Sequence, residues 1–261
     1  MIHKFSDIHP DAKIGKNVTI EAFTTIQKNV VIGDGTWIGP HVSILDGARI
    51  GENCKIFPGA VISAIPQDLK FKGEDTVVII GNNVMLREYV TVNRGTIANN
   101  STVVGDNCLL QAYVHIAHDC ILGKNCIIGG SSGLAGHIRV NDFAIIGGMS
   151  GVHQFVNIGA HSMISGGSLV RKDIPPFTKG AREPMSFVGV NSIGLRRRGY
   201  SIEKIKEIHN IYRIIYLKGY NISQALDIIT NEIPQTTERD EILNFIKSST
   251  RGIMRGYCNK D

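Results

Sequence analysis

Aliphatic residues recur at every sixth position over most of this chain. Ten isoleucines follow one another at this spacing from Ile8 to Ile62 without a miss, and the same phase resumes at Ile80 and continues, with one further gap, to Val170. This period differs from the roughly 3.6 residues of a helix and from simple strand alternation, so it predicts short extended segments that bury their apolar residues only by stacking. The spacing therefore favours a parallel β-helix.

The residues within each six-residue unit support this interpretation. A small or β-branched residue stands four positions after each aliphatic anchor, and the two together would fill a narrow interior. Six extended residues make one short face, and three faces close a triangular coil of about eighteen residues. We expect roughly eight coils and a prism on the order of 40 Å long. Four cysteines occupy the small interior position and are expected to be buried core residues, namely Cys54, Cys108, Cys120 and Cys126.

Composition and charge narrow the class of protein. The chain has 261 residues, is 43% hydrophobic and lacks an apolar run long enough to cross a membrane. Its first ten residues contain no apolar export segment, so we expect a cytoplasmic protein. Residues 1–170 carry 12 basic and 13 acidic side chains, whereas residues 171–261 carry 16 and 10. An anionic partner should therefore meet the C-terminal part. Nucleic acid is disfavoured because aromatic residues do not alternate with the basic ones.

Two stretches, 63–79 and 93–103, lack anchors, yet the phase returns after both. They should leave and re-enter the coil as projecting loops, which is where binding groups are often carried. After Val170 the repeats stop, and apolar spacing from Ser201 onward predicts helices. We therefore expect a β-helix domain over residues 1–190 and a helical domain over residues 191–261.

Three histidines, His118, His137 and His153, are separated by nineteen and sixteen residues, which is close to one coil each. They should therefore lie near one edge of the prism on three consecutive coils. A neutral imidazole there could accept a proton from a substrate hydroxyl, with a neighbouring residue such as Asp119 or Gln154 setting its tautomer. Three imidazoles could instead bind zinc. The spacing favours base catalysis and leaves the metal alternative open.

Longer motifs carry a resemblance to a known family. The segments QDLK at 67–70, YVHIAHDC at 113–120 and FAIIGGMSGVHQF at 143–155, with GVN and LRRRG at 189–199, resemble the UDP-N-acetylglucosamine O-acyltransferases of lipid A biosynthesis. These are hexapeptide-repeat acyltransferases, and the resemblance spans nearly the whole chain. It implies a left-handed coil, which handedness statistics for parallel crossovers alone would not predict. It also implies a homotrimer with the active site between neighbouring subunits.

The activity implied by the resemblance is transfer of a 3-hydroxyacyl chain from acyl carrier protein to the glucosamine 3-hydroxyl of UDP-N-acetylglucosamine, the first step of lipid A biosynthesis. It requires neither a metal nor another cofactor. The acidic carrier would dock on the basic C-terminal part, and salt should weaken that encounter.

The resemblance also assigns roles to individual residues. His118 would be the general base, Asp119 would orient and polarise it, and the Gly136 N–H would stabilise the oxyanion. Further substrate-binding positions are Asp68, Lys70, His115, His137, His153, Gln154 and, along the acyl channel, Gly166. Asn191, Arg197 and Arg198 match the residues that bind uridine and diphosphate.

Two positions depart from the family pattern. Pro184 replaces the histidine that limits the acyl pocket, and Ile193 replaces an acidic residue after the GVN motif. The sequence also leaves three alternative functions open, which are an acetyl-CoA-dependent acetyltransferase, a histidine-zinc lyase and a non-catalytic scaffold. A scaffold would not require stacked histidines or the projecting loop that carries Lys70.

Overall fold

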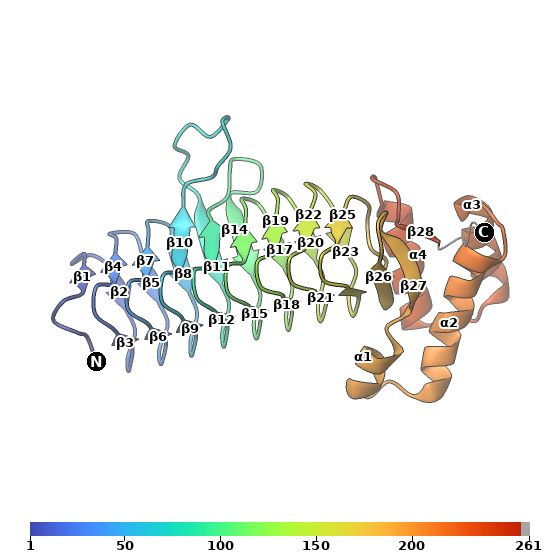
Figure 1. The fold of residues 1–261 in the computed structure, drawn as a ribbon, viewed down its shortest axis with the longest axis horizontal. Coiled ribbons are helices and arrows are strands. Elements are labelled where there is room, and N and C mark those ends of the chain that lie inside the picture. Colours follow the sequence, from blue (N-terminus) through green and yellow to red (C-terminus); the bar gives the residue numbers. More distant parts are fainter. Residues whose placement is uncertain (257–261) are drawn as a thin grey trace.

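The computed structural model describes residues 1–256 and confirms the predicted left-handed parallel β-helix. Twenty-five short strands, β1–β25, follow one another along the prism, and each contains one of the predicted aliphatic anchors. Figure 1 shows the strands stacked along the long axis of the molecule, with the helices gathered at the C-terminal end. The six-residue spacing therefore located every strand of the prism.

The strands form three parallel sheets, one for each face of the prism, which we call A, B and C. Sheet A contains β3 (Thr19–Ile20), β6 (Trp37–Ile38), β9 (Lys55–Ile56), β12 (Met85–Leu86), β15 (Leu109–Leu110), β18 (Ile127–Ile128), β21 (Ile145–Ile146) and β24 (Met163–Ile164). Sheet B contains β1 (Asp7–Ile8), β4 (Thr25–Ile26), β7 (Ser43–Ile44), β10 (Val61–Ala64), β13 (Thr91–Asn93), β16 (His115–Ile116), β19 (Gly133–Leu134), β22 (Gly151–Val152) and β25 (Leu169–Val170). Sheet C contains β2 (Lys13–Ile14), β5 (Val31–Ile32), β8 (Ala48–Ile50), β11 (Val77–Ile80), β14 (Ser101–Val104), β17 (Ile121–Leu122), β20 (Arg139–Val140) and β23 (Asn157–Ile158).

In-register pairing produces the columns on which the site depends. In sheet B, His115 pairs with Gly133 and Gly133 pairs with Gly151, so positions eighteen residues apart lie side by side on one face. The anchors point inward, and from Ile20 onward they are almost fully buried, whereas Ile8 and Ile14 are half-buried. Most corners turn through a residue with positive φ three positions after the anchor, such as Asp119 (62°) and His137 (63°).

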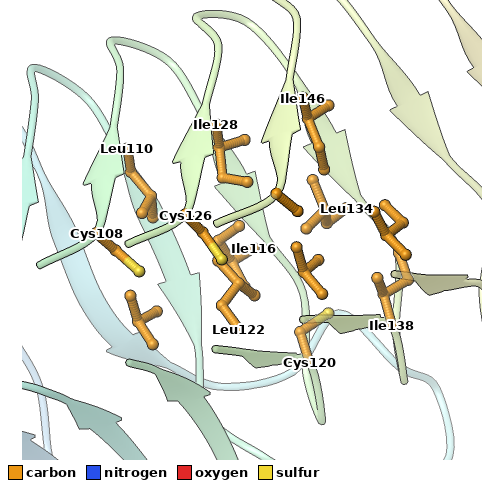
Figure 2. Packing of buried hydrophobic residues seen from close by; sticks show 14 of the residues in the cluster. Cys108, Leu110, Ile116, Cys120, Leu122, Cys126, Ile128, Leu134, Ile138 and Ile146 are labelled. Carbon is orange, nitrogen blue, oxygen red and sulfur yellow. The ribbon is translucent and has the colours of Figure 1, made fainter. Parts of the chain in front are cut away.

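The interior confirms the prediction for the four cysteines. All four are buried and free, and Figure 2 shows Cys108 and Cys126 on neighbouring coils beside the aliphatic anchors. Burial raises the pKa of the Cys120 thiol to about 12. The four cysteines are therefore packing groups of the interior.

The two predicted loops project from the same part of the prism, near β10 and β14 (Figure 1). They are shorter than the stretches without anchors because β10, β11, β13 and β14 extend into those stretches. One loop covers residues 65–76 and the other residues 94–100. Both follow strands of sheet B and return to sheet C, so they lie at the same edge of the prism.

The C-terminal part adds more than the predicted helices. Two further strands, β26 (Thr178–Ala181) and β27 (Ser186–Val190), extend sheet A, and a short helix, α1 (Ser192–Arg197), follows. The predicted helices are α2 (Ile202–Leu217), α3 (Ile222–Glu232) and α4 (Thr237–Ser248). Asn221 caps α3 in a capping box with Gln224. None of the helices in residues 1–256 has the length and apolar character needed to cross a membrane.

The last described strand, β28 (Arg255–Gly256), pairs with β27. The domain boundary predicted after residue 190 falls between β27 and α1, but β28 returns to sheet A beyond it. Residues 257–261 of the predicted helical domain lie outside the described residues.

Candidate functional site

A buried histidine–carboxylate pair lies at the corner between sheets B and C. His118 and Asp119 follow β16, and their side chains are 8% and 0% exposed. The His118 Nδ1 atom lies 2.8 Å from Asp119 Oδ2. A carboxylate in this position accepts the Nδ1–H and leaves the lone pair on Nε2. The pair therefore has the geometry of an oriented base.

Asp119 is held by the loop 94–100. Its Oδ1 accepts hydrogen bonds from the backbone N–H of Thr96 (3.0 Å) and of Asn99 (3.2 Å), and its Oδ2 accepts one from the Thr96 hydroxyl (2.7 Å). Burial raises the pKa of the Asp119 carboxyl, but the hydrogen bonds from His118 and Thr96 outweigh it, so the pKa lies below its usual range. Asp119 is therefore a fixed negative charge beside His118.

His137 lies one coil further on, at the same corner. Its ring packs edge-on against His118 with centroids 5.1 Å apart, and it stacks on Phe155 of the next coil at 4.6 Å. Its Nδ1 atom is 3.8 Å from Asp119 Oδ2. Burial lowers the pKa of His137, and the Asp119 carboxylate opposes part of that effect. His137 is therefore a second imidazole facing the same space.

Gly136 lies directly against the His118 ring. A Cβ atom at this position would be 2.6 Å from His118 Cε1 and 2.8 Å from Nε2, which leaves no room for a side chain. Among the described residues, the Gly136 N–H has no hydrogen-bond partner. A residue with a free backbone donor therefore adjoins the His118 ring.

Asp68 and Lys70, on the loop 65–76, share a cavity of about 220 Å³ with His137 and with the loop 94–100. Asp68 Oδ1 accepts the backbone N–H of Lys70 at 2.9 Å, which orders this part of the loop. Both projecting loops thus border the His118 corner, because the loops and this corner all lie at the edge between sheets B and C.

His115 and His153 lie next to the His118 corner, on the face formed by sheet B. They border a largely apolar groove of about 480 Å³ whose floor includes Gly133 and Gly151. His115 Nδ1 lies 2.7 Å from the Thr91 hydroxyl, and burial, with a further contribution from His118, lowers its pKa.

His118, His137 and His153 follow β16, β19 and β22, so they occupy one edge on three consecutive coils, as predicted. They stand at different positions within the corner, and His153 is exposed on the groove side with the equally exposed Gln154 beside it. Only His118 and His137 are in mutual contact through their rings.

Asn191 and Arg197 lie on a different face of the prism. Both border a cavity of about 340 Å³ on sheet A, beside β24 and β26. Asn191 caps α1 by accepting the Gly194 N–H, and its Nδ2 donates to the His161 carbonyl at 2.9 Å. Its side chain is buried, so in this structure it holds α1 against the prism.

Arg198 and Gly166 lie at the two remaining corners. The Arg198 guanidinium covers the Phe143 ring at 5.2 Å, and its Nη2 donates to the Phe143 carbonyl at 3.0 Å, at the corner between sheets C and A. Gly166 is exposed at the corner between sheets A and B, where it packs against Gly148 of the preceding coil. One chain therefore brings His118, Asp119, Gly136, His137, Asp68 and Lys70 together and leaves the other predicted site residues on separate surfaces.

Sequence reasoning missed the residues that hold Asp119 in place. Thr96 and Asn99 carry no recognisable motif, and the backbone N–H groups that they use are invisible in a sequence pattern. The sequence spacing did contain one signal for this contact, because the stretch 93–103 precedes Asp119 by about one coil. A loop that projects from the prism there must therefore lie beside the edge that carries the histidines.

The same cluster of side chains could also be a metal-binding site. His118, Asp119 and His137 each offer a ligand atom, and these atoms lie within 4.8 Å of one another. However, each Asp119 oxygen already accepts two hydrogen bonds, from His118 and from the loop 94–100. A carboxylate has about four lone-pair sites, so none remains for an ion. The donor set therefore fits proton transfer better than metal binding.

Comparison with family models finds two matches. The C-terminal residues 173–254 match the family of UDP-N-acetylglucosamine O-acyltransferase domain 2. Residues 29–64 and 101–136 match bacterial transferase hexapeptide repeats. The two matches together cover both parts of the molecule.

Similar proteins extend over almost the whole chain. An acyl-(acyl-carrier-protein)–UDP-N-acetylglucosamine O-acyltransferase of Thermodesulfovibrio yellowstonii is 46% identical, covering 97% of this chain and 99% of the relative. The enzyme of the same name from Aliivibrio fischeri strain MJ11 is 45% identical, covering 98% and 100%. Among solved structures, a UDP-N-acetylglucosamine acyltransferase of Bacteroides fragilis 9343 is 51% identical with a TM-score of 0.96, covering 98% of this chain and 100% of that one.

Proposed function

The chain belongs to the UDP-N-acetylglucosamine O-acyltransferase family and is an acyl-carrier-protein-dependent O-acyltransferase, and from this premise we propose that His118 is its general base. The transferred group is a 3-hydroxyacyl chain and the acceptor is the glucosamine 3-hydroxyl. The reaction is the first step of lipid A biosynthesis, and it takes place in the cytoplasm.

The reaction begins with proton transfer to His118. Its Nε2 accepts the proton of the sugar 3-hydroxyl while the hydroxyl oxygen attacks the thioester carbonyl. Asp119 fixes the tautomer and stabilises the imidazolium that forms. The tetrahedral oxyanion accepts the Gly136 N–H. When the intermediate collapses, the carrier sulfur leaves and takes the proton from His118, so that the products are an ester and a free thiol.

The observation that carries this proposal is the buried His118–Asp119 pair, at 2.8 Å, with Gly136, whose N–H has no partner among the described residues, packed against the same ring. These features supply a base, a group that orients it and an oxyanion donor within one corner. His137, Asp68 and Lys70 border the adjoining cavity and are the proposed sugar-binding groups. The saturation of the Asp119 oxygens supports base catalysis over a zinc lyase.

The function is tested by offering UDP-N-acetylglucosamine with 3-hydroxyacyl carriers of graded chain length, and with acetyl-CoA as the competing donor. We expect one 3-O-ester product, identified by mass spectrometry, and no acetylated sugar. Preference for acetyl-CoA would reject the carrier-dependent activity. A protein that releases no ester from any donor would favour the scaffold alternative.

A homotrimer would unite the residues that one chain leaves apart. The sugar-binding corner follows sheet B, whereas the cavity containing Arg197 lies on sheet A. If sheet A of one subunit faces sheet B of the next, the two halves adjoin across the interface. Three copies close such a head-to-tail arrangement into a ring. In that ring the histidines and the α1 segment of different subunits form one substrate cleft.

The two faces differ in the size of their outward side chains. From β12 to β24 the outward positions of sheet A form an apolar column of large residues, namely Met85, Leu109, Ile127, Ile145 and Met163. The corresponding column of sheet B contains the two glycines of the groove floor. The edge shared by sheets A and B would point toward the three-fold axis, and it carries exposed Phe23, Tyr89, Tyr113 and Met149. Burial of this edge would account for so many large apolar side chains in water-exposed positions.

The trimer makes a specific prediction for Ile127. We expect the wild-type protein to sediment with three times the mass of one chain, and Ile127→Glu to dissociate it, because the change places an unpaired charge in an apolar interface. Ile121→Glu is the matched control, since Ile121 is also half-buried and outward-facing but lies on sheet C. A trimer that survives Ile127→Glu, or that is lost equally with Ile121→Glu, would contradict the proposed interface. The basic C-terminal surface remains the predicted dock for the carrier.

A further inference from the structure

The cavity on sheet A contains a cation that the motif comparison did not single out. Its walls are apolar, with Ile145, Met163 and Val190 on the strands and Ile193 on α1. Met163 and Ile193 are 40% and 58% exposed, so both present apolar surface to this cavity. Lys179 borders the same cavity together with Arg197.

The sheet register explains why Lys179 reaches this cavity. Lys179 pairs with Met163 of β24 on one side and with Gly189 of β27 on the other, so it continues the outward column of sheet A. Gly189 has a φ of 128° and no side chain, and a Cβ atom there would lie 3.8 Å from Lys179 Cε. The lysine side chain therefore lies over the glycine, beside α1.

Both cations lack a counter-charge. No acidic side chain borders the cavity, and within residues 1–256 neither Lys179 nor Arg197 takes part in a salt bridge. Arg198, by contrast, is engaged with Phe143 at another corner. Two unpaired cations above an apolar wall match a ligand that joins adjacent anionic groups to a planar ring.

We infer that Lys179 and Arg197 together bind the diphosphate of the sugar nucleotide, with the uracil ring against Ile193 and Met163, while Asn191 and Arg198 position α1. The inference rests on the proposed function for the identity of the nucleotide. The Lys179 ammonium and the Arg197 guanidinium each donate charge-assisted hydrogen bonds to phosphate oxygens. Lys179 is thus a substrate-binding residue additional to those carried by the family motifs.

The test compares binding of UDP and of uridine to the intact protein by calorimetry. Lys179→Ala should weaken UDP binding about tenfold and leave uridine binding unchanged, because one charge-assisted contact to phosphate is lost. In the transferase assay the KM for UDP-N-acetylglucosamine should rise by a similar factor, with the carrier KM unchanged. Lys55→Ala is the matched control, since Lys55 stands in the same outward column on β9, far from the cavity that contains Lys179.

Unchanged UDP affinity in Lys179→Ala would overturn the inference. Equal weakening of UDP and uridine would also overturn it, because that result indicates disturbed packing, and so would a comparable loss in Lys55→Ala. The binding measurement is independent of turnover. A wild-type protein that binds UDP through Lys179 but transfers no acyl group would therefore retain the inference and reject the proposed function.

Discussion

Replacement of His118 by alanine is expected to lower kcat about a thousandfold, within the range observed for loss of a general base. The imidazole is the group that accepts the hydroxyl proton and returns it to the leaving thiol, so its removal affects both halves of the reaction. KM for the sugar nucleotide should change little, because the proposed diphosphate contacts lie on the other subunit. Steady-state turnover with saturating substrates measures the effect.

The control separates catalysis from folding. His118 is packed between Asp119, Gly136 and His137, so the variant must show the wild-type mass and melting behaviour before its rate is interpreted. His9→Ala removes an exposed histidine at the far end of the prism and should retain wild-type activity. A correctly assembled His118→Ala protein with wild-type turnover would refute the assignment of the base.

Asp119→Asn is expected to lower kcat by about a hundredfold to ten-thousandfold, the upper value being the loss seen when a triad histidine loses the carboxylate that sets its tautomer. The asparagine amide has one acceptor oxygen, whereas Asp119 accepts four hydrogen bonds from His118, Thr96 and Asn99. The amide group would face a donor, and the His118 ring would no longer be fixed. The loss should appear in kcat rather than in KM.

The pH dependence of stability distinguishes the role of Asp119 from a general packing defect. Its lowered pKa means that the hydrogen-bonded carboxylate stabilises the fold above the ordinary aspartate pKa, and this contribution disappears as the pH falls through the lowered value. Asp119→Asn should therefore have a flatter acid limb of melting temperature against pH than the wild type. Thr96→Val, which removes one donor to Asp119, should cause a much smaller loss of kcat. Equal losses in the two variants would argue against a specific role in orienting His118.

The prism could be predicted almost strand by strand because one periodic signal determines it. Every predicted aliphatic anchor lies in an observed strand. The position of His118 and His137 on one edge followed from the number of residues per coil. Handedness could not be predicted this way, since both hands bury the same residues. The strands β26–β28 and the helix α1 were missed because they pair irregularly after the repeat ends, where no periodicity remains to be read.

The site was only partly predictable, for a geometric reason. Motifs identify residue types, but the faces of a three-sided column separate residues that are neighbours in sequence. Arg197 and Arg198 are adjacent in the chain, yet one borders the sheet A cavity and the other packs on Phe143. Lys179 belongs to no motif and became visible only through its pairing with Met163 and Gly189.

The antiparallel turn from β26 to β27, followed by β28, affects how the molecule behaves in a crowded solution. A column of parallel strands ends in unpaired backbone groups onto which another copy could stack. Here sheet A reverses direction at β27 and, within residues 1–256, finishes with the two-residue strand β28. A strand as short as β28 gives an incoming strand little to pair with, so stacking of another copy onto sheet A is disfavoured there.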